Sequence, residues 1–314
     1  MRGGIDLGGT KIQAAIVGDG AAILGRSRHE TPTDGGPEKV ATELVQALRD
    51  AAEDAGVLVP DLESVGVGAP GIVDTAAGTV AHSPNIEGWD DPFPVARVLG
   101  DELGVPVTVS NDVGAAVEAE LQYGAGRDVQ SLLGVFWGTG VGGGIVFDRK
   151  LWHGRGAAGE IGHVVAKPGG RPCGCGRRGC VEAYAGRGQL EERARYLAKK
   201  HKTVLFEIQK ERGRPRLTSG VWHRALEHDD EMAERLLERA VKALGVGIAS
   251  ALNLLDVEVV VIGGGLGLKL GEPWLEKVRD ATMPHLFTSS RPPDFRLSQL
   301  GDDGGAIGAA LLAR

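Results

Sequence analysis

The chain of 314 residues has few cysteines, no long apolar run and no excess of positive charge. No apolar stretch approaches the ~20 residues that a membrane helix needs, so we expect no membrane partner. The formal net charge of -7 argues against nucleic acid as the main partner. The N-terminal sequence GGIDLGGT has neither the basic region nor the apolar core of a signal peptide, so we expect a cytoplasmic protein.

Two common nucleotide-binding motifs are missing as well. The chain has no GxxxxGKS or GxxxxGKT motif of the Walker A type. Its first glycine-rich turn leads into another strand, whereas the dinucleotide-binding motif leads into a helix. The 50 glycines instead form clusters at the ends of predicted strands. Because glycine allows the backbone to approach a ligand closely, these clusters favour binding turns over flexible linkers.

The order of the predicted elements indicates an α/β fold. Strands are predicted at 4–8, 12–17, 64–69, 105–109, 131–147 (two strands) and 257–262, and helices at 38–55, 112–123, 230–254 and the C-terminus. The two strand–turn–strand segments have the same layout, which predicts two similar lobes. Strands that alternate with helices favour sheets that are covered by helices on both faces.

The sequence DLGGTK (6–11) places an acid, two glycines, a hydroxyl and a lysine at a strand end. Glycines let backbone N–H groups reach phosphate oxygens, and the acid can hold a Mg²⁺-bound water. GTGVGGG (138–144) and GGGLG (263–267) suit a second phosphate turn and the base or ribose of a nucleotide. Each cluster alone is also compatible with a simple tight turn. The predicted cofactor-binding residues are Asp6, Gly8, Gly9, Thr10, Lys11, Gly138, Thr139, Gly140, Gly264, Gly265 and Leu266.

All three cysteines lie in the segment CGCGRRGCVE (173–182). An odd number of cysteines in a reducing compartment argues against a disulfide framework and favours a metal site or structural thiols. Zinc takes four ligands in a tetrahedron, and Cys173, Cys175 and Cys180 with the nearby His163 supply a Cys₃His set. A closed site of this kind is structural. A strained disulfide of the CxC pair and three buried thiols are the alternatives.

Asp112, in VSNDVGAA, follows an apolar strand and opens a helix. A helix N-terminus keeps a carboxylate ionised, so Asp112 can accept a proton from a substrate hydroxyl. The competing interpretation is a helix cap, in which Asn111 or Asp112 satisfies N–H groups of the first turn. Glu160 and Glu182 flank a run rich in glycine and cysteine, which favours fixed site carboxylates over solvated surface charges.

The three glycine turns, in this order, resemble those of the superfamily of sugar kinases, heat-shock proteins and actin. Within it, the chain is similar to the ROK family of sugar kinases, and most to bacterial ATP-dependent glucokinases, from GIDLGGTK to GAIGAALLA. It matches the family's CxCGxxGCxE motif at every fixed position. The resemblance implies a two-lobed actin-like (ribonuclease H-like) fold with a cleft between the lobes. It also implies phosphorylation of a hexose, at the 6-hydroxyl of glucose, with ATP, Mg²⁺ and a structural Zn²⁺.

The resemblance also assigns roles to residues. Asp112 is the expected general base, because the family's catalytic aspartate lies in an Asn-Asp pair at this place. The expected sugar-binding residues are Gly71, Asn85, Asn111, Asp112, Glu160, His163 and Glu182. The expected metal ligands are His163, Cys173, Cys175 and Cys180. We expect a small lobe of residues 1–110 and 301–314, a larger lobe of residues 111–300 that carries the zinc site, and a homodimer or homotetramer.

Three questions stay open on the sequence alone. The sugar can be another hexose or an N-acetylhexosamine (N-acetylglucosamine, N-acetylmannosamine, mannose or fructose), because packing builds the pocket around its 2-position. The donor can be ATP, ADP or polyphosphate, although the glycine turns suit an adenine nucleotide better. A sugar-responsive regulator of the same family is disfavoured, because Asp6 stands too early in the chain for a preceding DNA-binding domain. Ser110 and Gly186 depart from the family pattern and can tune the sugar pocket.

Overall fold

The computed structural model describes residues 1–82, 88–287 and 290–313. It divides into two compact units, the first of residues 1–127, 153–156 and 302–314 and the second of residues 128–152 and 157–301. The first boundary therefore falls after Arg127, beyond the expected boundary after Ser110. As a result, the helix that Asp112 opens belongs to the first unit.

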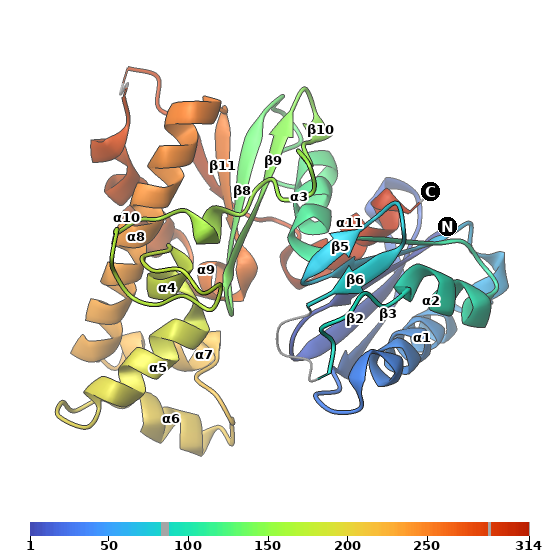
Figure 1. Cartoon of the computed structure of the whole chain (residues 1–314), viewed down its shortest axis with the longest axis horizontal. Coiled ribbons are helices and arrows are strands. Elements are labelled where there is room, and N and C mark those ends of the chain that lie inside the picture. Colours follow the sequence, from blue (N-terminus) through green and yellow to red (C-terminus); the bar gives the residue numbers. More distant parts are fainter. Residues whose placement is uncertain (83–87, 288–289, 314) are drawn as a thin grey trace. The chain divides into compact units, whose positions relative to one another are not determined.

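The strands of the first unit are β1 (Arg2–Leu7), β2 (Lys11–Val17), β3 (Ile23–Glu30), β4 (Val65–Ala69), β5 (Ile72–Asp74), β6 (Thr79–Ala81) and β7 (Val107–Asn111). Its α-helices are α1 (Gly36–Ala55), α2 (Val95–Leu103), α3 (Asp112–Tyr123) and α11 (Gly304–Leu312), and its short 3-10 turns are Asp19–Ala21 and Val59–Asp61. The main sheet has the order β3-β2-β1-β4-β7, and its strands β2 and β3 are labelled in Figure 1. β1, β2 and β3 form an antiparallel meander, whereas β4 and β7 continue the sheet in parallel with β1.

Helices cover both faces of this sheet. Successive residues of a strand point to opposite faces. A side chain at Gly3 would meet Leu48 of α1, and one at Gly4 would overlap the carbonyl oxygen of Ala306 in α11. α1 and α11 therefore lie on opposite faces, and the absence of a side chain at Gly4 lets α11 pack directly on the backbone of β1. α11 also packs against α3, which carries Asp112.

The strands of the second unit are β8 (Leu132–Trp137), β9 (Val141–Phe147), β10 (Lys150–Leu151), β11 (Val259–Gly263) and β12 (Asp294–Leu297). Its α-helices are α4 (Glu182–Ala185), α5 (Arg187–Leu197), α6 (Leu205–Glu211), α7 (Ser219–Glu227), α8 (Glu231–Leu255), α9 (Gly264–Leu270) and α10 (Glu272–Thr282). Short 3-10 turns lie at Ile161–His163 and Met283–His285, and a third, Gly301–Asp303, leads into α11. The sheet order is β10-β9-β8-β11-β12.

The two sheets follow the same plan. In each, an antiparallel meander of three strands is extended by two parallel strands. The prediction of an α/β protein with two similar lobes is therefore confirmed. Within the described residues, no helix combines the length and the apolar character that crossing a membrane requires.

The long helix α8 shows how the sequence builds the second unit. The Asp230 side chain caps it by accepting a hydrogen bond from the N–H of Ala233, at 2.8 Å. Its apolar residues, Leu236 and Leu244 among them, are buried in a core that also contains Trp137 and Trp222. The exposed side of α8 is charged, as an amphipathic surface helix should be.

Candidate active site

The turn between β1 and β2 is closed by hydrogen bonds of its own. The N–H of Gly8 donates to the carbonyl of Lys11 at 2.9 Å, and the Thr31 hydroxyl donates to the carbonyl of Gly8 at 2.6 Å. Lys11 forms an ion pair with Asp302, at 2.9 Å. The predicted first phosphate turn, which also contains Gly9 and Thr10, is thus a fixed loop with a cation at its end.

Asp6, on β1, lies close enough to Asp112, at the start of α3, for the two charges to repel. The pKa of Asp6 is raised to about 7, first by burial and then by the charge of Asp112, while Lys11 opposes both effects. The carboxylate of Asp302 acts in the same direction as Asp112. The first unit therefore brings the charges of Asp112, Asp302 and Lys11 close to Asp6, and a divalent cation would stabilise these three carboxylates.

The structure separates the two roles that the sequence left open for the Asn-Asp pair. The side chain of Asn111 caps α3 by accepting a hydrogen bond from the N–H of Gly114, at 3.0 Å. Asp112 accepts one from the N–H of its neighbour Val113, at 2.9 Å. Asn111 therefore supplies the cap. Asp112 is the member of the pair whose charge acts on Asp6.

Gly71 lies in the turn between β4 and β5 with a φ of +102°, which L side chains rarely adopt. A side chain there would stand 2.6 Å from the carbonyl oxygen of Ala81. This position therefore requires glycine for backbone reasons alone. The other predicted sugar contact of this region, Asn85, lies outside the described residues.

Two acidic residues of the first unit were not among the predicted site residues. Asp302 pairs with Lys11, and Asp303 accepts a hydrogen bond from Gln13 at 2.8 Å. Both precede α11, in the sequence GDDGGAIG. The two adjacent acids before a glycine-rich helix start could have indicated a functional site. Nothing in the sequence alone, however, connected them to a turn almost 300 residues earlier.

In the second unit, residues of α4 and α5 form hydrogen bonds with the turn Gly138–Gly140, which joins β8 and β9, and with Val141 next to it. The N–H of Val141 donates to Glu182 at 2.9 Å. A side chain at Gly140 would overlap the same carboxylate, so glycine is needed for this approach. The N–H groups of Arg187 and Gly188 donate to the carbonyls of Gly138 and Thr139, each at 3.1 Å. The predicted second phosphate turn is therefore built together with Glu182.

Arg187 was not predicted and is the strongest addition to the site. Its guanidinium donates to the hydroxyl of Thr139 at 2.8 Å and to the hydroxyl of Ser219 at 3.3 Å. Burial lowers the pKa of Arg187 from its ordinary value, with Glu191 opposing and Arg216 assisting this shift. Among the described residues this desolvated guanidinium is hydrogen-bonded only to hydroxyls beside a glycine turn, an arrangement that is suited to a phosphate.

The predicted nucleotide turn at the end of β11 lies against the Gly138 turn. A side chain at Gly138 would be 3.8 Å from the N–H nitrogen of Gly265, and one at Gly265 would be 3.6 Å from the Ser219 hydroxyl. Gly264 has a φ of +79°. The side chain of Leu266, in contrast, is fully buried in the core. The structure therefore does not expose Leu266 to a ligand.

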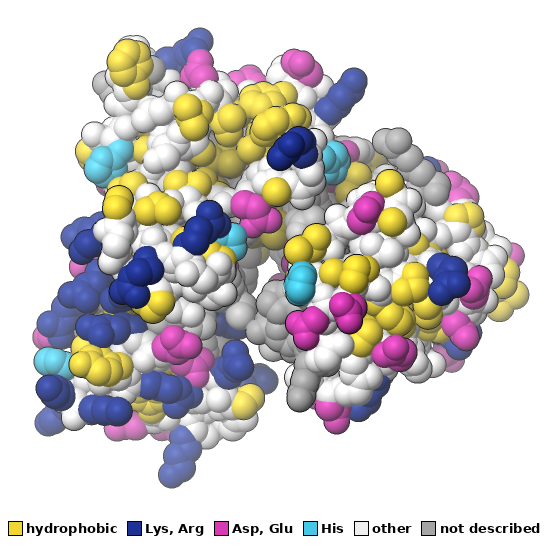
Figure 2. All heavy atoms as spheres, viewed as in Figure 1, with side chains coloured by type: hydrophobic (Ala, Val, Ile, Leu, Met, Phe, Trp, Pro, Cys, Tyr) yellow, Lys and Arg dark blue, Asp and Glu magenta, His cyan; other side chains and the backbone are white. Residues whose placement is uncertain are grey.

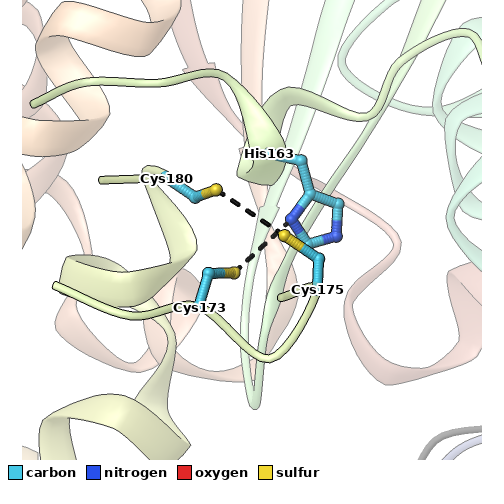
Figure 3. Close-up of side chains that lie close together, drawn as sticks. All are labelled: His163, Cys173, Cys175 and Cys180. Atoms are coloured by element: carbon cyan, nitrogen blue, oxygen red, sulfur yellow. Dashed lines mark hydrogen bonds between the residues drawn. The ribbon is translucent and has the colours of Figure 1, made fainter. Parts of the chain in front are cut away.

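The four predicted metal ligands come together in the second unit (Figure 3). Their ligand atoms, one from each of His163, Cys173, Cys175 and Cys180, all lie within 4.8 Å of one another. The sulfurs of Cys175 and Cys180 are 3.8 Å apart. A zinc tetrahedron with Zn–S bonds of about 2.3 Å separates two sulfurs by about 3.8 Å. All three cysteines are free thiols, so the structure has no disulfide in the CxC pair.

Figure 3 shows the His163 ring pointing into the cluster. Its Nδ1 lies 3.7 Å from the sulfur of Cys173, and its Nε2 lies 4.0 Å from a carboxylate oxygen of Glu160. One ring nitrogen therefore faces the thiols while the other faces a predicted sugar-binding residue. Glu182 lies at the other edge, with Oε1 at 4.0 Å from the sulfur of Cys173.

The thiols differ in their ease of ionisation. Hydrogen bonds from Arg177 lower the pKa of Cys175 to about 6, whereas burial raises the pKa of Cys173 to about 12 and raises that of Cys180. Only a cation among them would favour three thiolates at this spacing. The donor set and the geometry therefore fit a tetrahedral zinc site.

Comparisons with known proteins agree with this arrangement. The ROK family model matches residues 2–314. The chain is 33% identical to a glucokinase of Halalkalibacterium halodurans, over 99% of this chain and 94% of that protein. It is 34% identical to an N-acetylmannosamine kinase of Haemophilus influenzae, over 98% and 93%.

Solved structures give the same result. The ROK hexokinase from Thermus thermophilus has a TM-score of 0.80 at 37% identity, covering 99% of this chain and 97% of that one. A ROK family glucokinase from Streptomyces griseus, solved with glucose and AMPPNP, has a TM-score of 0.85 at 32% identity, covering 100% and 99%.

Two similar α/β units with glycine turns at their strand ends, matched over their whole length by these structures, define a two-lobed sugar kinase of the actin-like fold. The chain belongs to the ROK family. The predicted family, fold class and enzyme class, a sugar kinase, are thereby confirmed.

Proposed function

We propose that the protein is an ATP-dependent glucokinase, which transfers the γ-phosphoryl group of ATP to the 6-hydroxyl of glucose. Relatives named glucokinase support this substrate, and the Streptomyces griseus structure with glucose and AMPPNP supports both substrates. The alternative sugar is N-acetylmannosamine, because kinases of that name are as similar to this chain. The two sugars differ at the 2-position, so the pocket has to distinguish one sugar from the other there.

The observation that carries the proposal is the pairing of Asp6 and Asp112 beside the first glycine turn. Phosphoryl transfer needs positioned phosphates, neutralised charge and one group that accepts the hydroxyl proton. In this proposal Asp112 accepts the proton of the 6-hydroxyl. Asn111 supplies the helix cap, and this leaves Asp112 available for that role at a helix N-terminus, where an ionised carboxylate is favoured.

Asp6 and the glycine turns would hold the nucleotide. Asp6 and Asp302 are hard oxygen ligands of the kind that Mg²⁺ prefers, and the mutual repulsion of the carboxylates fits a site made for a cation. When bound, Mg²⁺ neutralises charge on the β- and γ-phosphates. In the turn of the first unit, Thr10 and Lys11 offer donors to a phosphate. In the turn of the second unit, Thr139, Gly140 and Arg187 offer donors to a phosphate.

The cysteine cluster is a structural zinc site in this proposal. His163, Cys173, Cys175 and Cys180 complete the tetrahedron, which leaves no open position for water or substrate. The neighbouring Glu160 and Glu182 are then held beside the cluster. With the Nδ1 of His163 on the metal, its Nε2 is left to donate to a sugar hydroxyl.

The test is a coupled ADP-release assay over glucose, mannose, fructose, N-acetylglucosamine and N-acetylmannosamine, with ATP, ADP and polyphosphate as donors. We expect the highest kcat/KM for glucose with ATP. A preference for N-acetylmannosamine would replace glucose in the proposal and leave the mechanism intact. Analytical ultracentrifugation of the same sample distinguishes the expected homodimer and homotetramer.

The base is tested by Asp112→Asn, which keeps the size of the side chain and removes its charge. We expect kcat to fall by roughly 10²- to 10⁴-fold, the usual contribution of a general base. Sugar binding by calorimetry should change much less. Glu118→Gln is the matched control on α3, because its carboxylate bonds only to Gln122, one turn away. Near wild-type turnover of Asp112→Asn would rule out Asp112 as the base.

A further inference from the structure

The second unit carries a cavity of about 890 Å³ that is lined by none of the predicted site residues. Its walls come from residues 166–178, from α4 and from α8. The charged residues of the lining are all basic: Lys167, Arg171, Arg178, Arg239 and Lys242. Charged residues of this one sign are unexpected in a chain with a net charge of -7.

None of these five cations has a carboxylate partner within 4 Å in the described part of the chain. Arg235 is a useful contrast, because it lies one turn earlier on α8 and pairs with Glu231 at 3.3 Å. Figure 2 shows Lys and Arg side chains gathered over the helical part of the second unit. The cavity therefore gathers five cations that no carboxylate of the described residues pairs with.

Like charges are also close to one another here. Arg193 and Arg239 both lie near enough to Arg171 to repel its guanidinium electrostatically. This repulsion costs free energy, and an anion bound beside Arg171 and Arg239 would relieve it.

The walls of the cavity are fixed before any ligand binds. The N–H groups of Ala166 and Lys167 donate to the carbonyl of Gly179 at 2.9 and 3.0 Å. The N–H of Arg171 donates to the Tyr184 hydroxyl at 3.0 Å, and its guanidinium lies 5.0 Å from the centre of the same ring. Arg239 and Lys242 are three residues apart on α8, which places them on one face of the helix. A preformed cationic cavity binds without a large ordering cost.

We propose that this cavity is a second ligand site, separate from the nucleotide turns, that binds a small molecule with two or more phosphate groups. Its volume lies in the range of about 300–1,000 Å³ that small-molecule sites occupy. Guanidinium groups bind phosphate oxygens in pairs, and several cations around one cavity favour more than one phosphate. Tyr184, Ala243 and Val246 offer an apolar wall to the rest of such a molecule.

The test is calorimetric titration with inorganic pyrophosphate in magnesium-free buffer. We compare the wild-type protein with the double variant Arg239→Gln/Lys242→Gln and with the control Arg235→Gln. The double variant alters only α8 and leaves the loop next to the cysteines unchanged. We expect the double variant to bind pyrophosphate roughly tenfold more weakly or worse, and the control to stay within about twofold of wild type. Binding in the glycine turns contributes equally to all three proteins.

Inorganic phosphate is the second probe. It should bind at least roughly tenfold more weakly than pyrophosphate, because it engages fewer of the cations. Equal affinity for the two anions would overturn the requirement for several phosphates. Rising salt should weaken binding at this partly exposed site.

Three results would overturn the proposal. One is equal pyrophosphate affinity in wild type and the double variant. Another is an equal loss of pyrophosphate affinity in Arg235→Gln, because the effect would then come from surface charge in general. The third is a change of oligomeric state in the double variant with unchanged pyrophosphate binding, which would make this surface an interface between copies of the chain. Zinc content and hexose phosphorylation are measured in parallel. Absence of hexose phosphorylation in the wild type would refute the kinase proposal and leave this comparison intact.

Discussion

Replacing Glu182 tests whether this carboxylate acts on the sugar alone or also on the second glycine turn. The sequence assigned it to the sugar, yet its Oε2 accepts the N–H of the buried Val141 at 2.9 Å. In Glu182→Ala that donor loses its partner. An unsatisfied buried N–H costs about 1 to 3 kcal/mol. Since 1.4 kcal/mol is a factor of ten in an equilibrium constant, the turn should open roughly 5- to 150-fold more often.

Hydrogen–deuterium exchange of the peptide that contains residues 138–141 measures this opening directly. We expect faster exchange there in Glu182→Ala and weaker binding of AMPPNP by a similar factor. Glu182→Gln should restore most of both, because its amide oxygen can accept the same hydrogen bond. Glu192→Ala, on the exposed side of the adjacent α5, is the control. Unchanged exchange in Glu182→Ala, with a raised KM for the sugar only, would refute the role of Glu182 in holding the turn.

Three further predictions follow from the same geometry. Arg187→Gln should weaken AMPPNP binding roughly tenfold in calorimetry and leave sugar binding unchanged, since its guanidinium reaches Thr139 and not the cysteine cluster. Asp6 has a folded pKa of about 7 against an ordinary 3.8, so it destabilises the fold increasingly as pH rises from 4 to 7. Asp6→Asn should therefore raise the free energy of unfolding at pH 8, by at most about 4 kcal/mol, and hardly at pH 4, in urea titrations without magnesium. Chelation of zinc, or Cys175→Ala, should weaken sugar binding most and AMPPNP binding measurably. Full retention of both would contradict a structural metal.

The sequence predicted the elements that lie in regular apolar patterns. The strands at the first and second glycine turns, the strand before the Gly264 turn and the long helix α8 all occur within a few residues of their predicted positions. β3, in contrast, was not predicted. Its sequence ILGRSRHE is rich in charge because it is an edge strand, which α1 covers, and just one of its residues is buried. Local pattern gives a weak signal at such an edge.

The candidate site was predictable where its residues lie close together in sequence, as in the first glycine turn and the cysteine segment. The acids Asp302 and Asp303 could not be connected to Lys11, because α11 returns to the first sheet only in the folded chain. Arg187 was missed for a related reason. Its role depends on hydrogen bonds to Thr139 and Ser219, which are distant in sequence.

The segment from Cys173 to Gly188 connects features that the sequence analysis treated as separate. Its cysteines belong to the cluster that is proposed to hold zinc, Glu182 bonds the backbone of the second glycine turn, and Arg187 bonds the hydroxyl within that turn. The loop immediately before it forms one wall of the basic cavity. A metal bound by these cysteines would therefore affect more than the proposed sugar site. The hydrogen bonds at Val141 and Thr139 come from Glu182, at the start of α4, and from Arg187, at the start of α5, so we expect loss of the proposed metal also to disturb the turn that is proposed to bind phosphate.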